Sequence, residues 1–162
     1  DGVLGYVPGL AGMHDVDDYP NAVQVPGLVV YRYDSPLFFA NAEDFLTRAL
    51  AAMREASPDC RWFVLNAEAI VEVDLTSVDT LESLRESMAS RGVTFAMARV
   101  KFELREQLEA AGFAQKVGEG LIFPTLPTAV DAYARWYRAE QGEAPPGLPV
   151  SPPEPSTPDG QI

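Results

Sequence analysis

Cysteine and histidine are scarce in this chain, which has one cysteine, Cys60, and one histidine, His14, among 162 residues. A single cysteine forms no intrachain disulfide and no cysteine-rich metal site. A single histidine, with no Gly-x-Ser-x-Gly or Cys/His context, provides neither a histidine-based metal site nor a nucleophilic triad. The carboxylates Asp15, Asp17 and Asp18 lack the spacing of a calcium loop. We therefore expect no catalytic residues, no metal site and no enzyme.

Basic residues are also few, with 12 Lys and Arg against 24 Asp and Glu and a net charge of -12. Nucleic-acid binding needs a continuous basic face, so this class of partner is excluded. The sequence has no apolar run near the roughly twenty residues of a membrane-spanning helix, and no signal peptide. The chain begins at Asp1 without methionine, which suggests a soluble fragment cut from a longer protein.

Apolar residues make up 47% of the chain, enough for one domain with a real core. Residues 1–21 are rich in Gly, Pro and Asp, and they predict an irregular lead-in with one short edge strand. Residues 22–141 carry the folded domain. Residues 142–162 turn to Pro, Gly, Ser and Glu, a composition that predicts a disordered C-terminal tail.

Strand and helix patterns alternate through the folded part. Strands are expected within residues 24–34, 61–66, 93–98 and 122–123, and helices over 42–56, 76–91, 101–111 and 129–141. The apolar run 62–65 is typical of a central strand covered on both faces, and Phe38, Phe39, Trp62 and Phe63 are expected in the core. This order predicts an α/β fold, a mixed sheet flanked by about four helices.

A binding site is expected at the carboxyl ends of the strands, where open α/β sheets hold ligands. Thr76 and Ser77 follow Asp74 at a helix start, whose free amides attract an anion unless Thr76 merely caps the helix. Arg99 and Lys101 follow the next strand and reach a phosphate unless they pair with neighbouring glutamates. The candidate nucleotide-binding residues are Asn41 and Asn66 for base or ribose, and Thr76, Ser77, Arg99 and Lys101 for the phosphates, with Asp74 as a further candidate in the same loop.

Several motifs in order along the chain carry a family resemblance. The stretch SPLFFANAEDF at 35–45 resembles the opening of the STAS domain of bacterial SulP sulfate permeases. The loop Asp-Leu-Thr-Ser at 74–77, the segment LEAAG at 108–112 and the segment FPTLPTAV at 123–130 are similar to later STAS elements. Together these matches span residues 4 to 140, and they imply a STAS-type fold.

The resemblance implies a cytoplasmic regulatory domain of a SulP-type sulfate or anion transporter in an inner or plasma membrane. Its partners would be its own upstream transmembrane transport domain and, in the intact transporter, a second copy as a homodimer. No cofactor is required, but nucleotide binding has been proposed for STAS domains as a group, so weak binding of GTP, GDP or ATP is expected. No phosphate-binding Gly-x-x-x-x-Gly-Lys loop is present, so hydrolysis is not expected.

The alternative is a free-standing protein that resembles the anti-sigma-factor antagonists. In those relatives a serine directly after the aspartate is phosphorylated, and the added charge switches partner binding. This chain has Leu75 at that position, so a phosphoswitch would have to use Thr76 or Ser77 instead. The departure favours the transporter-linked reading.

Overall fold

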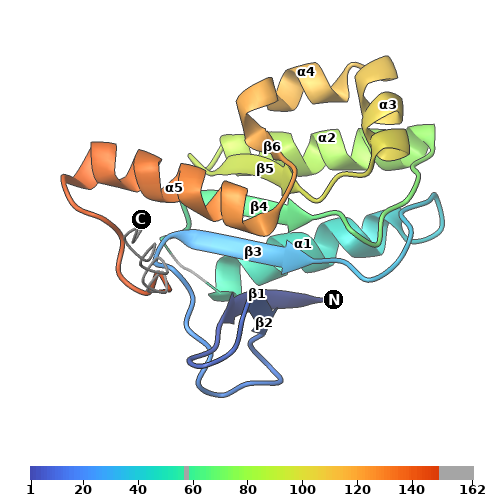
Figure 1. The fold of residues 1–162 in the computed structure, drawn as a ribbon. Helices are drawn as coiled ribbons and strands as arrows, with labels where there is room; N and C mark the ends of the chain where they lie inside the picture. Colours follow the sequence, from blue (N-terminus) through green and yellow to red (C-terminus); the bar gives the residue numbers. More distant parts are fainter. Residues whose placement is uncertain (57–58, 150–162) are drawn as a thin grey trace, which may run out of the picture.

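The computed structural model describes residues 1–56 and 59–149, which form one mixed six-stranded sheet in the order β2-β1-β3-β4-β5-β6 (Figure 1). The strands are β1 (Gly2–Tyr6), β2 (Met13–Asp15), β3 (Leu28–Arg32), β4 (Trp62–Asn66), β5 (Thr94–Ala98) and β6 (Ile122–Phe123). The helices are α1 (Ala42–Ala56), α2 (Leu75–Ala89), α3 (Phe102–Ala110), α4 (Phe113–Val117) and α5 (Leu126–Gln141), with a 3-10 turn at Glu119–Leu121.

Four of the strands run in parallel. Strand β4 pairs with β3 and β5, so Val64 lies between Val30 and Ala96, and β6 continues the parallel set beyond β5. Strands β1 and β2 add an antiparallel hairpin beside β3. Because β3, β4 and β5 are parallel, the loops that follow them lie at one edge of the sheet, to the right in Figure 1.

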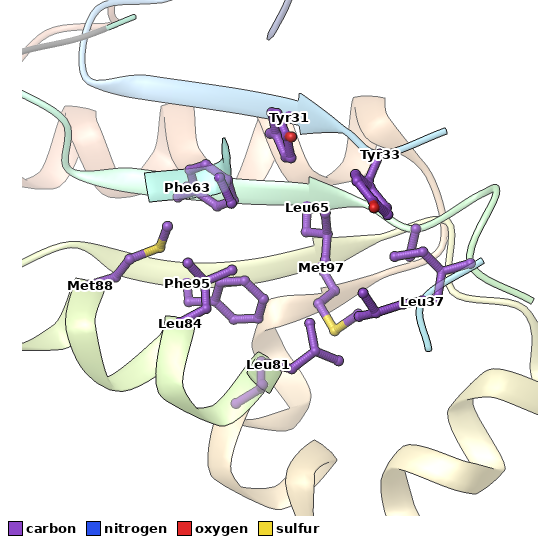
Figure 2. Packing of buried hydrophobic residues seen from close by; sticks show 14 of the residues in the cluster. Tyr31, Tyr33, Leu37, Phe63, Leu65, Leu81, Leu84, Met88, Phe95 and Met97 are labelled. Atoms are coloured by element: carbon purple, nitrogen blue, oxygen red, sulfur yellow. The ribbon is translucent and has the colours of Figure 1, made fainter. Parts of the chain in front are cut away.

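Two apolar clusters cover the two faces of the sheet. Helices α1 to α4 contribute to the larger cluster, which receives Phe63 and Leu65 from β4 (Figure 2). Helix α5 lies on the opposite face, where its Tyr133 packs in the cluster that receives Trp62 and Val64. All five residues of β4 are buried, which confirms the expected central strand.

Tyr133 fastens α5 to the turn that precedes β3. Its hydroxyl donates a hydrogen bond of 2.5 Å to the Pro26 carbonyl, and burial raises the pKa of Tyr133 to about 12, so the donor proton is retained at neutral pH. Gly27 has a φ of 79°, and a Cβ there would collide with the Tyr133 hydroxyl oxygen. The glycine therefore permits both the left-handed turn and the close approach.

The structure differs from the sequence-based expectation at both ends of the domain. The first fifteen residues form two strands where one edge strand was expected. Gly2 and Gly5 weaken the strand signal in the sequence, but in the fold they allow neighbouring groups to approach the backbone closely. Helix α4 is an addition to the four expected helices, and five residues are too few for a recognisable period. Helix α5 begins before residue 129, since Thr125 and Thr128 form a capping box.

The chain continues to contact the domain beyond α5. Gly142 ends the helix in the left-handed conformation with a φ of 81°, at the expected boundary. Leu148 nevertheless packs against the cluster on the α5 face, so contact extends past residue 142. The remainder of the tail predicted to be disordered, residues 150–162, lies outside the described residues.

We predict that Leu65→Ala lowers the free energy of unfolding by about 2–5 kcal/mol, because the leucine is fully buried and its removal leaves a cavity. Denaturant unfolding measures the change. The matched control is Leu75→Ala, which removes the same atoms from a side chain that is 81% exposed and should change stability by less than about 0.5 kcal/mol. Similar losses for both variants would contradict the central position of β4.

Candidate functional site

Three loops meet at the carboxyl edge of the parallel strands. They are residues 33–41 after β3, 67–74 after β4 and 99–101 after β5. Leu37 and Val73 form an isolated parallel bridge between the first two loops. The Val73 amide donates a hydrogen bond of 2.9 Å to Oε1 of Gln107, which belongs to α3. The loops are therefore joined to one another and to the helix that follows the third.

Asp74 connects two of these loops through one carboxylate. Its Oδ1 accepts a 2.8 Å hydrogen bond from the Ser77 amide and so caps α2, while Oδ2 accepts a 2.8 Å bond from the Phe39 amide. Hydrogen bonding from Ser77 and from the Phe39 amide holds the pKa of Asp74 below its usual range by stabilising the charged form. The expected cap at Thr76 is wrong, because α2 begins one residue earlier and Thr76 lies in its first turn.

The two asparagines shape their own loops. Asn41 Oδ1 accepts from the Phe38 amide at 3.0 Å, and its Nδ2 donates to the Pro36 carbonyl at 2.8 Å. Asn66 is 2% exposed, and its Oδ1 accepts from the Glu68 amide at 3.1 Å. Both side chains are thus engaged by backbone groups at the edge where they were expected.

The basic candidates Arg99 and Lys101 lie at the same edge, after β5. Arg99, which has a φ of 57°, pairs with Glu68 at 2.7 Å and lines a surface cavity of about 400 Å³ beside Leu126 at the start of α5. Lys101 precedes α3 and is exposed. Between residues 1 and 149, apart from 57 and 58, no hydrogen bond or ion pair joins either cation to Thr76 or Ser77.

The site candidates therefore fall into two groups at one edge. One group surrounds Asp74 and includes Asn41, with Thr76 exposed and Ser77 fully buried. The other surrounds the Arg99–Glu68 pair and includes Asn66. A ligand that contacted both groups would have to span the loop between β4 and α2. Whether these residues bind a nucleotide stays a prediction.

Sequence reasoning missed the exposure of the apolar side chains at this edge. Phe38 and Phe39 were expected in the core, but they are 48% and 74% exposed. Leu37, one residue before them, is buried, because its bridge to Val73 turns it toward the larger cluster. Pro36 before this apolar run and Asn41 after it, both residues that favour turns, were the available signal that the run lies in a loop.

An antiparallel hairpin added to a parallel sheet, with the loops after the parallel strands gathered at one edge, defines a small mixed α/β domain. The STAS domain model matches residues 19–129, and the chain belongs to the STAS domain family. The resemblance inferred from the sequence motifs is confirmed. Among the helices in the described part of the chain, none has the length and apolar character needed to cross a membrane.

Similar proteins include sulfate transporters. The chain is 62% identical over 135 residues to the probable sulfate transporter Rv1739c of Mycobacterium tuberculosis, covering 83% of this chain and 24% of that one. It spans about a quarter of the length of the curated relatives that it matches.

Two solved structures share the fold. A sulfate transporter family protein from Wolinella succinogenes is 28% identical, with a TM-score of 0.62 over 76% of this chain and 97% of that one. The SulP transporter STAS domain from Vibrio cholerae is 24% identical, with a TM-score of 0.61 over 76% of this chain and 94% of that one. The second likeness supports the fold alone.

We predict that Asp74→Asn weakens the link between the loops, because asparagine keeps one acceptor oxygen where two amides now bond. Amide exchange at Phe39 or Ser77 should accelerate severalfold in NMR measurements at fixed pH. Asp79→Asn, an exposed change in the first turns of the same helix, is the matched control and should leave both amides unaffected.

The carboxylate of Asp74 also makes the cap of α2 dependent on pH. Since the pKa of Asp74 is lowered in the folded state, its capping contribution is present above the ordinary value of 3.8 and is lost as the pH falls through the lower folded pKa. The Phe39 and Ser77 amide resonances should therefore titrate with a midpoint below 3.8. A midpoint at or above that value would show that the two amides do not stabilise the charge.

Proposed function

We propose that the chain is the regulatory domain of a SulP-type sulfate or anion transporter, placed on the cytoplasmic side of an inner or plasma membrane. The observation that carries the proposal is the 62% identity to a probable sulfate transporter, of which this domain spans 24%. The remaining length of such a transporter would carry the transport pathway. This domain would then act on its folding, delivery or rate.

The charge of the domain supports an indirect role. A net charge of -12 disfavours binding of sulfate to this surface, because the summed field repels anions. The substrate would therefore be handled elsewhere in the transporter. The domain would influence transport through protein contacts, without catalysis of its own.

The alternative, a phosphoswitch of the anti-sigma-factor-antagonist kind, has less support. Leu75, which stands where those relatives carry the modified serine, is the first residue of α2 and is 81% exposed. Its side chain has no hydroxyl to modify. The neighbouring Ser77 is fully buried, so a kinase would have to use the exposed Thr76 in this turn.

We predict that removal of residues 22–141 from the intact transporter lowers sulfate uptake, because the membrane part loses its regulatory contact or its delivery. Uptake of labelled sulfate and the amount of transporter in the membrane should be measured together. Leu65→Ala, which destabilises the domain in place, should lower uptake in the same direction. Full uptake with an unchanged amount of transporter would contradict the proposed function.

We also propose weak, non-hydrolytic binding of a guanine or adenine nucleotide at the carboxyl edge. The exposed positions of Thr76 in the first turn of α2 and of Lys101 before α3 support it, as does the guanidinium of Arg99. A phosphate at the start of α2 would compete with Asp74 for the Ser77 amide, which accounts for weak binding. Arg99 would likewise have to exchange Glu68 for the phosphate.

Nucleotide titration into isotopically labelled protein tests this site. GTP or ATP should shift the amide resonances of Asn66, Thr76, Ser77, Arg99 and Lys101, and added salt should weaken the shifts. The double variant Arg99→Ala/Lys101→Ala should bind less, because two cations are lost. The matched control Arg54→Ala/Arg91→Ala removes two exposed cations elsewhere. Equal binding by the two double variants, or no shifts at all, would refute the site.

A further inference from the structure

An exposed apolar surface occupies the carboxyl edge of the sheet. Seven large apolar side chains in residues 1–56 and 59–149 are exposed, and five of them lie in the loops after β3, β4 and β5 or at the helix starts that follow. We call these five the apolar platform: Phe38 (48% exposed), Phe39 (74%), Val71 (45%), Leu75 (81%) and Phe102 (71%).

Hydrogen bonds hold the platform together. The Phe39 amide bonds to Asp74, the residue before Leu75, so the first two loops are joined directly beneath their exposed side chains. The bond from Val73 to Gln107 brings α3 to the same place. Phe102 begins that helix, five residues or about 7.5 Å along its axis from Gln107. Figure 1 shows the three loops at one end of the sheet.

The stability of the fold does not require apolar residues at these exposed positions. Leu75 and Phe102 are the first residues of α2 and α3, positions where polar residues serve as well. Single exposed apolar residues are ordinary on protein surfaces, but a group gathered from three loops marks an interaction site. The platform therefore needs a partner with an apolar surface of its own.

The charges around the platform restrict that partner. Its exposed acidic neighbours in sequence are Glu43, Asp44, Glu72, Asp74, Asp79 and Glu103, of which Asp44 pairs with Arg48. Among the nearby cations in the described part of the chain, Arg99 and Arg105 pair with Glu68 and Glu109, which leaves Lys101 without an ion pair. Anionic lipid headgroups would be repelled by such a rim. A second copy would bring two acidic rims together, which opposes pairing. A basic partner is complementary in charge.

The proposed function supplies a partner of that chemistry. About three-quarters of the length of the sulfate transporter relatives lies outside the matched segment. Cytoplasmic loops of membrane proteins carry an excess of Lys and Arg. We propose that the apolar platform docks on a basic, partly apolar cytoplasmic segment of the transporter's own membrane part. This inference rests on the proposed function, and it identifies the surface by which the domain would contact and regulate the membrane part.

Site-specific photocrosslinking in the intact transporter tests the docking surface. Phe39→p-benzoylphenylalanine and Phe102→p-benzoylphenylalanine place a photoreactive ring at the platform with little change in shape. Leu10→p-benzoylphenylalanine is the matched control, since Leu10 is 47% exposed in the turn between β1 and β2. After irradiation of membranes, mass spectrometry identifies the crosslinked peptides.

Both platform positions should crosslink to Lys- or Arg-containing segments of the membrane part, several times more than the Leu10 position does. Crosslinks to residues 1–149 of a second copy would overturn the proposal in favour of self-association. Crosslinks to lipid alone, or yields no higher than at Leu10, would overturn it as well.

A transport assay separates this inference from the function on which it rests. Phe39→Ala/Phe102→Ala should lower sulfate uptake without reducing the amount of transporter in the membrane, while Leu10→Ala/Val23→Ala should leave uptake unchanged. If removal of residues 22–141 has an effect but the platform variant behaves like its control, the docking surface is wrong and the proposed function stands. If removal itself has no effect, the proposed function fails.

Discussion

The parallel pairing of β3, β4 and β5 is the constraint on which both the core and the site depend. Phe63 and Leu65 of β4 face the larger cluster, while Trp62 and Val64 face the cluster that contains α5. A slip of one residue would exchange the two faces, so burial on both sides fixes the register. The same pairing brings three loops to one edge of the sheet, as Figure 1 shows. The position of the site is therefore a consequence of how the core is packed.

The carboxylate of Asp74 turns this shared edge into a single surface. One oxygen caps α2, and the other holds the amide of Phe39 from the preceding βα loop. The helix start is thereby supplied with an internal anion, which reduces its attraction for an external phosphate. Ser77 cannot offer its amide to Asp74 and to a ligand at once. Any event that draws Phe39 away from the edge would also loosen the cap of α2, so loop position and helix stability are coupled.

The central strand, and the edge of the sheet at which the candidate residues lie, could be predicted from the sequence because they depend on local patterns and on topology. The run from Trp62 to Leu65 was long and apolar enough to identify the central strand, and Asp74 follows it to the expected edge. Burial and hydrogen-bond partners could not be predicted, since tertiary contacts decide them. Leu37 is buried by its bridge to Val73, whereas Phe39, two residues later, is 74% exposed. Apolar residues of the same kind thus serve the core and the surface within one short segment.

In a surface with an apolar centre and an acidic rim, the apolar side chains provide affinity and the carboxylates provide selectivity. In the proposed docking, Phe39, Leu75 and Phe102 supply the area removed from water, which stabilises the complex with little regard to partner charge. The rim carboxylates, such as Glu72 and Asp79, select against acidic surfaces and speed the approach of basic ones. Near a membrane this division has a specific effect, because anionic headgroups and basic protein loops lie side by side there. The rim holds the apolar side chains away from lipid, and the same charge draws them toward the protein.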